Sequence, residues 1–128
     1  MNSAVLDASA LLALLNGEPG AQVVAAAEVA GACISAVNLS EVVAKLRERG
    51  VAETAVQAAL SGVRLAVIEF DASQAFAAGF LRPHTRSAGL SFGDRACVAL
   101  GQHLGLPVLT TDRVWASLGL PVTVTPIR

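Results

Sequence analysis

Short apolar runs typical of buried strands alternate along this chain with longer runs typical of helices. Strands that are connected through helices pair in parallel, and a parallel sheet needs helices on both of its faces. The sequence therefore predicts an α/β fold, with residues 82–89 as a loop. The expected strands are residues 4–6, 32–35, 65–70, 108–111 and 122–125. The expected helices are residues 8–15, 18–30, 38–48, 51–61, 72–81 (with Asp71 as its cap) and 92–104.

Length and composition indicate a single folded domain, residues 1–128. A chain of 128 residues can bury about two thirds of its unfolded surface. With 54% hydrophobic and 15% charged residues, it does not belong to the intrinsically disordered class. Its net charge of −1 provides no overall attraction for nucleic acid, so an RNA ligand would need a local basic patch or a metal ion.

The first residues give no sign of export. No Lys or Arg precedes Asp7, which interrupts the first apolar stretch, so a signal peptide is not expected. No apolar run reaches the roughly 18 residues needed to span a bilayer. Cys33 and Cys97 stand among apolar residues and fit no metal motif, so we expect reduced, buried thiols. These features predict a cytoplasmic protein that does not bind a membrane.

Four acidic residues occupy positions where strands give way to helices. Asp7 and Asp112 directly follow predicted strands, and Glu41 and Asp94 fall in the first turns of predicted helices. In a parallel sheet, ligands bind at the carboxyl ends of the strands, beside the point where the strand order reverses. We therefore expect the four carboxylates to converge on one edge of the sheet.

Such a cluster needs a cation. Two unit charges 4 Å apart repel by roughly 4 kcal/mol at an effective dielectric near 20. A set of oxygen ligands suits Mg²⁺ or Mn²⁺. The acids therefore point to phosphate-ester chemistry.

Helix capping is the competing explanation for the same residues. Ser91-x-x-Asp94 and Asn38-x-x-Glu41 resemble capping boxes, and Asp7 and Asp112 could cap helices too. Asp71-x-x-Gln74 has the same pattern, so this chain is expected to cap at least one helix with Asp. Capping alone explains four acids poorly, because Gly, Ser or Thr would cap without charge repulsion.

Four segments, one around each acid, resemble the four motifs of PIN-domain ribonucleases. The closest branch is the VapC-type toxins of prokaryotic toxin–antitoxin pairs, and the motifs occur in order over nearly the whole chain. The segments are residues 5–9 (Val-Leu-Asp-Ala-Ser), 34–42 (Ile-Ser-Ala-Val-Asn-Leu-Ser-Glu-Val), 90–96 (Leu-Ser-Phe-Gly-Asp-Arg-Ala) and 108–112 (Val-Leu-Thr-Thr-Asp). The resemblance implies a PIN-like domain with sheet order 3-2-1-4-5.

The resemblance also implies a catalytic centre. Asp7, Glu41, Asp94 and Asp112 would be the catalytic, metal-binding tetrad of an endoribonuclease that uses Mg²⁺ or Mn²⁺. Such ions activate a water molecule for attack on the phosphodiester and stabilise the leaving oxygen. Ser9 and Thr110 match hydroxyl positions of the motifs and would assist, although local hydrogen bonds at a turn explain them equally well.

The implied partners are an RNA substrate, a cognate antitoxin protein and a second copy of the chain. Basic side chains near the motifs would contact RNA phosphates, where Arg binds in a bidentate manner. Ordinary solvated charge is the alternative for all of them. The candidates are Arg82, Arg86, Arg95 and Arg113.

Three other functions compete with this interpretation. A metal-dependent phosphatase or DNA nuclease would use a similar acidic centre. A receiver-like signalling domain also carries acids at strand ends, but it normally has a Lys after the fifth strand, whereas the only Lys here is Lys45. A non-catalytic PIN module would bind a partner without cutting RNA, and the complete tetrad argues against it.

Overall fold

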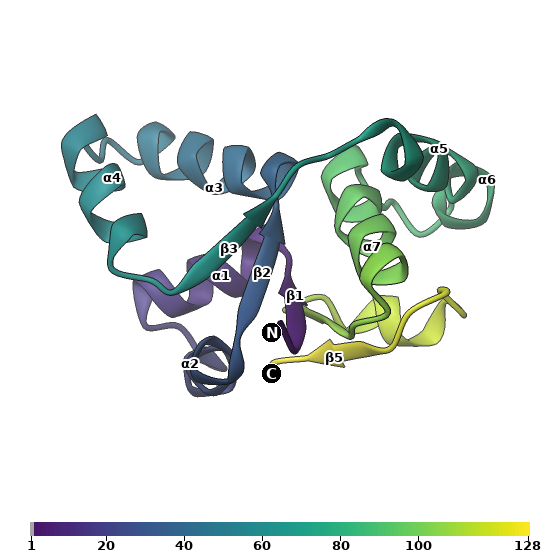
Figure 1. The fold of residues 1–128 in the computed structure, drawn as a ribbon, viewed down its shortest axis with the longest axis horizontal. Helices are drawn as coiled ribbons and strands as arrows, with labels where there is room; N and C mark the ends of the chain where they lie inside the picture. Colours follow the sequence, from purple (N-terminus) through teal and green to yellow (C-terminus); the bar gives the residue numbers. More distant parts are fainter. Residues whose placement is uncertain (1) are drawn as a thin grey trace.

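Five parallel strands form one sheet in the order β3-β2-β1-β4-β5, which confirms the predicted order (Figure 1). The computed structural model describes residues 2–128. The strands are β1 (Ala4–Leu6), β2 (Ala32–Ser35), β3 (Leu65–Ile68), β4 (Val108–Thr110) and β5 (Val124–Pro126). Strand order reverses between β1 and β4, because β2 and β3 extend the sheet on one side of β1 and β4 and β5 extend it on the other.

Helices cover both faces of the sheet, as predicted (Figure 1). They are α1 (Ala8–Asn16), α2 (Ala21–Ala30), α3 (Ala36–Glu48), α4 (Glu53–Ser61), α5 (Ala72–Phe80), α6 (Arg82–Thr85) and α7 (Phe92–Leu104), followed by the 3-10 helix η1 (Arg113–Ser117). Side chains alternate between the faces of a strand. Leu6 and Ile34 accordingly pack in one hydrophobic core with α1 to α4, whereas Val5 and Cys33 pack in a second core with α7 and η1.

The central strands β1, β2 and β4 are buried along their whole length, and the edge strands β3 and β5 are partly exposed. This explains why the central strands appear in the sequence as continuous apolar runs. Cys33 and Cys97 are free and buried, as expected. In residues 2–128, no helix has both the length and the apolar character that a membrane crossing requires.

Two segments differ from the prediction in kind. Residues 82–89 were expected to form a loop, but residues 82–85 form α6, which Pro83 permits because it lies in the first turn. The buried Thr85 hydroxyl donates to the Leu81 carbonyl oxygen at 2.8 Å and stabilises this turn. The 3-10 helix η1 was not predicted, and it begins where Asp112 accepts a hydrogen bond from the Val114 N–H.

Several boundaries also differ. The helix expected from residue 38 begins at Ala36, because the Ser35 hydroxyl accepts from the Val37 N–H at 3.2 Å and caps it there. Glu41 therefore lies in the second turn of α3 and not in the first. Two helices begin later than predicted: α2 begins at Ala21 instead of 18, and α4 begins at Glu53 instead of 51. Two strands end earlier, β3 at Ile68 instead of 70 and β4 at Thr110 instead of 111. Strand β5 spans Val124–Pro126 instead of residues 122–125.

Candidate active site

Asp7 lies at the carboxyl end of β1 and caps α1. Its Oδ1 accepts from the Ala10 N–H at 2.8 Å and from the Ser9 hydroxyl at 2.7 Å. The residue is only 5% exposed. Burial raises the pKa of Asp7 to about 6, against the lowering effect of hydrogen bonds from Ser9, Thr110 and Ala10, and the negative charge of Asp94 adds to the rise. Asp7 therefore caps α1, and its burial makes the ionised form of its carboxyl group unfavourable.

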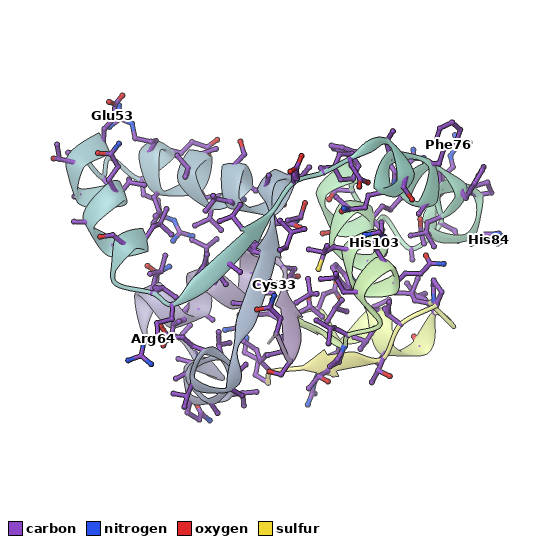
Figure 2. The ribbon with its side chains drawn as sticks, viewed as in Figure 1. Cys33, Glu53, Arg64, Phe76, His84 and His103 are labelled. Carbon is purple, nitrogen blue, oxygen red and sulfur yellow. The ribbon has the colours of Figure 1, made fainter. Side chains whose placement is uncertain are left out.

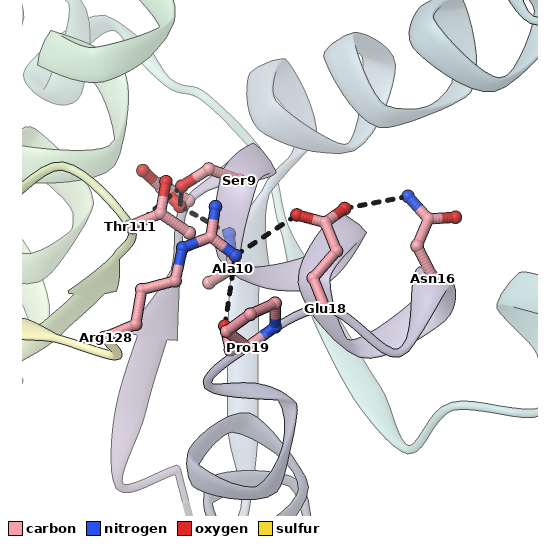
Figure 3. A network of polar contacts seen from close by, with 8 residues as sticks. Ser9, Ala10, Asn16, Glu18, Pro19, Thr111 and Arg128 are labelled. Atoms are coloured by element: carbon pink, nitrogen blue, oxygen red, sulfur yellow. Dashed lines mark hydrogen bonds and ion pairs between the residues drawn. The ribbon is translucent and has the colours of Figure 1, made fainter.

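Hydroxyl groups join Asp7 to the end of β4. The Ser9 hydroxyl, which donates to Asp7, also accepts from the Thr111 N–H at 3.0 Å (Figure 3). The buried Thr110 hydroxyl accepts from the Asp112 N–H at 3.1 Å. Ser9 and Thr110 thus make hydrogen bonds within the turns, and through them they hold the loops that carry Asp7 and Asp112 together.

Asp94 lies in the first turn of α7 and forms the predicted capping box. Its Oδ2 accepts from the Ser91 N–H at 2.9 Å, and its own N–H donates to the Ser91 hydroxyl at 3.2 Å. Burial raises the pKa of Asp94, and the charge of Asp112 also raises it, whereas the hydrogen bonds with Ser91 and the charge of Arg95 lower it. Asp94 is therefore close enough to Asp7 and to Asp112 for their negative charges to repel.

Glu41 reaches the same edge from α3. Its Oε1 accepts from the Asn38 side-chain amide at 2.8 Å, and the same amide donates to the carbonyl oxygen of Gly93 at 2.8 Å. Gly93 immediately precedes Asp94. A β carbon at Gly93 would overlap the Glu41 carboxyl group, so this carboxyl group lies directly against the first turn of α7.

The buried Cys97 thiol shows how near three of the acids lie to one another. Burial raises its pKa well above the ordinary value, and the negative charges of Asp7, Asp94 and Glu41 raise it further. Asp7 from the end of β1, Glu41 from α3 and Asp94 from α7 thus all lie near the buried Cys97 of α7, and Asp112 lies near Asp94.

None of these acids is neutralised by a basic side chain. In the part of the chain that the structure describes, residues 2–128, the single ion pair joins Arg128 to Glu18 at 3.2 Å (Figure 3). The hydrogen bonds to Glu41, Asp94 and Asp112 each engage one oxygen of the carboxylate: Oε1, Oδ2 and Oδ1, respectively. The second oxygen of each makes no hydrogen bond within residues 2–128. Their charge and their acceptor capacity are therefore both available to a cation.

Oxygen ligands of this kind fit Mg²⁺ or Mn²⁺. Within the same residues, no three His, Cys, Asp or Glu side chains come close enough together to enclose a metal ion. Mg²⁺ does not require such a cage, because it usually keeps several waters and binds through one or two carboxylates together with substrate phosphate oxygens. The donor set therefore fits a hard, hydrated divalent ion better than a tightly enclosed one such as structural zinc.

The four candidate RNA-binding arginines do not lie in one patch. Arg95 donates to the Ala78 carbonyl oxygen at 2.9 Å, and its guanidinium carbon lies 5.9 Å from the centre of the Phe92 ring, so it links α7 to α5. Arg113 donates to the Arg128 carbonyl oxygen at 2.9 Å. Arg82 and Arg86 are exposed and belong to the α6 region, which lies beyond α5 at the outer end of the molecule (Figure 2).

Sequence reasoning missed two residues of the site. Asn38 was interpreted as a helix cap, but it lies inside α3, and Gly93 was given no role. The spacing of Asn38 and Glu41, three residues apart, does indicate that they share one face of a helix. No local signal identifies the contact between Asn38 and Gly93, because it joins residues 55 positions apart.

Known structures share this fold. Similar chains occur in a DNA-bound VapBC complex from Salmonella typhimurium (TM-score 0.78, 18% identity, 100% of each chain covered) and in a toxin–antitoxin complex from Klebsiella pneumoniae (0.76, 22%, 98% of each). Another is VapC20 of Mycobacterium tuberculosis, described as a Sarcin-Ricin loop cleaving toxin (0.77, 21%, 92% of this chain and 96% of that one). No curated protein sequence matches the chain. The sequence model of the PIN domain matches residues 4–119, and the chain therefore belongs to the PIN domain family.

Proposed function

We propose that this protein is a divalent-metal-dependent endoribonuclease that acts as the toxin of a VapBC-type toxin–antitoxin pair. The observation that carries the proposal is the group formed by Asp7, Glu41, Asp94 and Asp112 at the carboxyl edge of the sheet. None of the four is paired with a basic side chain within residues 2–128, and three have an oxygen free of hydrogen bonds. Membership of the PIN domain family supports nuclease activity, and the RNA-cleaving neighbour supports RNA as the substrate.

Each acid has a distinct part in the proposed mechanism. Asp7 is the buried carboxylate of the site, and hydrogen bonds from Ser9 and Ala10 fix its position. Glu41 lies against Gly93 in the first turn of α7, the turn that carries Asp94, and Asp112 is exposed. Asp7, Glu41, Asp94 and Asp112 would hold a divalent ion, which would supply positive charge for the activation of water and for the leaving oxygen.

The proposed partners are a cognate antitoxin and a second copy of the chain. Complexes of toxins with antitoxins among the structural neighbours support an antitoxin partner. Phe76 and Phe80 on α5 are 67% and 71% exposed, and their ring centres lie 6.1 Å apart. Figure 2 shows Phe76 at the surface of the molecule. Aromatic residues are enriched at protein interfaces relative to the rest of the surface, so α5 is the surface from which to begin mapping both partners.

A cleavage panel tests the activity. The purified protein is incubated with structured RNAs, with DNA strands of the same sequences and with a phosphate monoester, in the presence of Mg²⁺, of Mn²⁺ or of EDTA. We expect cutting inside RNA that stops with EDTA. Metal-dependent cutting of DNA alone would favour the DNA nuclease alternative, and hydrolysis of the monoester alone would favour a phosphatase.

A further inference from the structure

Asn38 makes two hydrogen bonds at the acidic site, one within α3 and one from α3 to α7. The residue is 1% exposed, and its side-chain nitrogen donates to Glu41 Oε1 and to the Gly93 carbonyl oxygen, both at 2.8 Å. Among the hydrogen bonds that involve side chains in residues 2–128, only the one to Gly93 connects these two helices. The amide therefore contacts an acid of the site and the backbone that carries the next acid.

The orientation of the Asn38 amide is determined by its neighbours. Both groups that it contacts, the Glu41 carboxylate and the Gly93 carbonyl, are acceptors. A flipped amide would direct its oxygen at two other oxygens, which removes both hydrogen bonds and adds repulsion. The nitrogen must face them, so the amide acts as a donor to Glu41.

Gly93 confines Glu41 from the opposite side. It is buried, and a β carbon at this position would overlap the Glu41 carboxyl group. The absence of a side chain thus allows α3 and α7 to approach closely with the Glu41 carboxyl group between them. Held by a donor and by a backbone surface, Glu41 loses the rotamer freedom that a Glu on a helix surface normally has.

We propose that Asn38 is a positioning residue that fixes the Glu41 carboxylate against the first turn of α7, which carries Asp94, with Gly93 providing the space for it. This inference rests on the proposed function and extends it to a residue outside the acidic tetrad. Outer partners that orient metal-binding carboxylates typically change metal affinity or activity 10- to 100-fold when they are removed. Asn38 then acts through Glu41 and need not touch the substrate.

Two variants test the role: Asn38→Ala and the nearly isosteric Asn38→Asp. Mn²⁺ affinity is measured by titration calorimetry, kcat and KM by RNA cleavage, and unfolding by denaturant in EDTA. We expect Asn38→Ala to raise the Kd for Mn²⁺ about 10-fold or more and to lower kcat with little change in KM. Asn38→Asp, which places a second carboxylate against Glu41, should weaken Mn²⁺ binding at least as much without changing the volume of the side chain.

Gln74 supplies a matched control. Like Asn38 it is a buried amide, 2% exposed, whose nitrogen donates to a backbone carbonyl (Glu69, 3.0 Å) and whose oxygen has no partner within the described residues. Within residues 2–128 it makes no hydrogen bond to any of the four acids. Gln74→Ala should lower stability as Asn38→Ala does, yet leave the Kd for Mn²⁺ and kcat within about twofold of wild type.

A double-mutant cycle separates positioning from a general structural effect. If Asn38 acts through Glu41, Asn38→Ala should produce no further change in the Kd for Mn²⁺ when Glu41→Gln is already present. The inference is overturned if the wild-type protein binds Mn²⁺ and cleaves RNA while folded Asn38→Ala and Asn38→Asp bind Mn²⁺ with the wild-type Kd. A wild-type protein that binds no divalent ion would instead overturn the proposed function, and the inference with it.

Discussion

The backbone N–H of Asp7 donates to the carbonyl oxygen of Leu109 at 3.1 Å, which joins the end of β1 to the end of β4. This bond lies where the strand order reverses, the position at which parallel sheets bind ligands. It places Asp7 beside the turn that leads to Asp112. Backbone pairing, and not attraction between side chains, therefore brings the acids of β1 and β4 together despite their repulsion.

Asp7→Asn separates catalysis from capping. Asn keeps an oxygen that can accept from the Ala10 N–H and from the Ser9 hydroxyl, so the cap on α1 is preserved. It removes the charge that a cation would bind. We expect RNA cleavage to fall about 100-fold or more, with an unchanged or higher melting temperature in EDTA. Wild-type kcat in this variant would eliminate Asp7 from the catalytic group.

The stability of the metal-free protein should fall as the pH rises. Burial raises the pKa of Asp7 to about 6 from 3.8, so the folded protein holds this proton more tightly than the unfolded chain does. The unfolding free energy should therefore decrease between about pH 4 and pH 6, by up to about 3 kcal/mol for a shift of this size. Denaturant titrations in EDTA at several pH values measure this.

The same titrations on Asp7→Asn provide the control, because Asn does not titrate. Its unfolding free energy should vary less with pH over this interval than that of the wild type. Equal slopes for the two proteins would mean that Asp7 ionises as easily in the folded protein as in the unfolded chain.

The sequence predicts the sheet better than the contacts of the site. Continuous apolar strands are local features, and so are the acids that follow two of them: Asp7 lies just after β1 and Asp112 just after the neighbouring β4. The first residue of α3 was harder to predict, because Ser35 is both the last residue of β2 and the cap of α3. The contact of Asn38 with Gly93 depends on how α3 packs against α7, which no local pattern encodes.

The arginines should divide into two classes. Arg82 and Arg86 are exposed in the α6 region, so replacing both with Gln should raise KM for RNA, reduce its salt dependence and leave the melting temperature unchanged. Arg95 donates a hydrogen bond to the Ala78 carbonyl oxygen and lies over the Phe92 ring. We therefore expect Arg95→Ala to lower the unfolding free energy by about 1 kcal/mol. RNA-binding and thermal-melting curves measured on both variants check this division.

Asp71 and Asp94 form an internal comparison between capping and catalysis. Asp71 Oδ1 accepts from the Gln74 N–H at 2.9 Å and caps α5, just as Asp94 and Ser91 cap α7. Asp71 follows β3 at the edge of the sheet, away from the point between β1 and β4 where the order reverses. Asp71→Ala should therefore lower the unfolding free energy by roughly 0.5–2 kcal/mol.

Cleavage by Asp71→Ala should stay close to wild type at a temperature where the variant is folded. Asp94→Asn should behave in the opposite way, because it keeps an oxygen for the Ser91 N–H and removes the charge at the reversal point. Its stability should hold while cleavage is abolished. If Asp71→Ala abolished cleavage in a folded protein, the acidic group would extend to β3 and would have a fifth member.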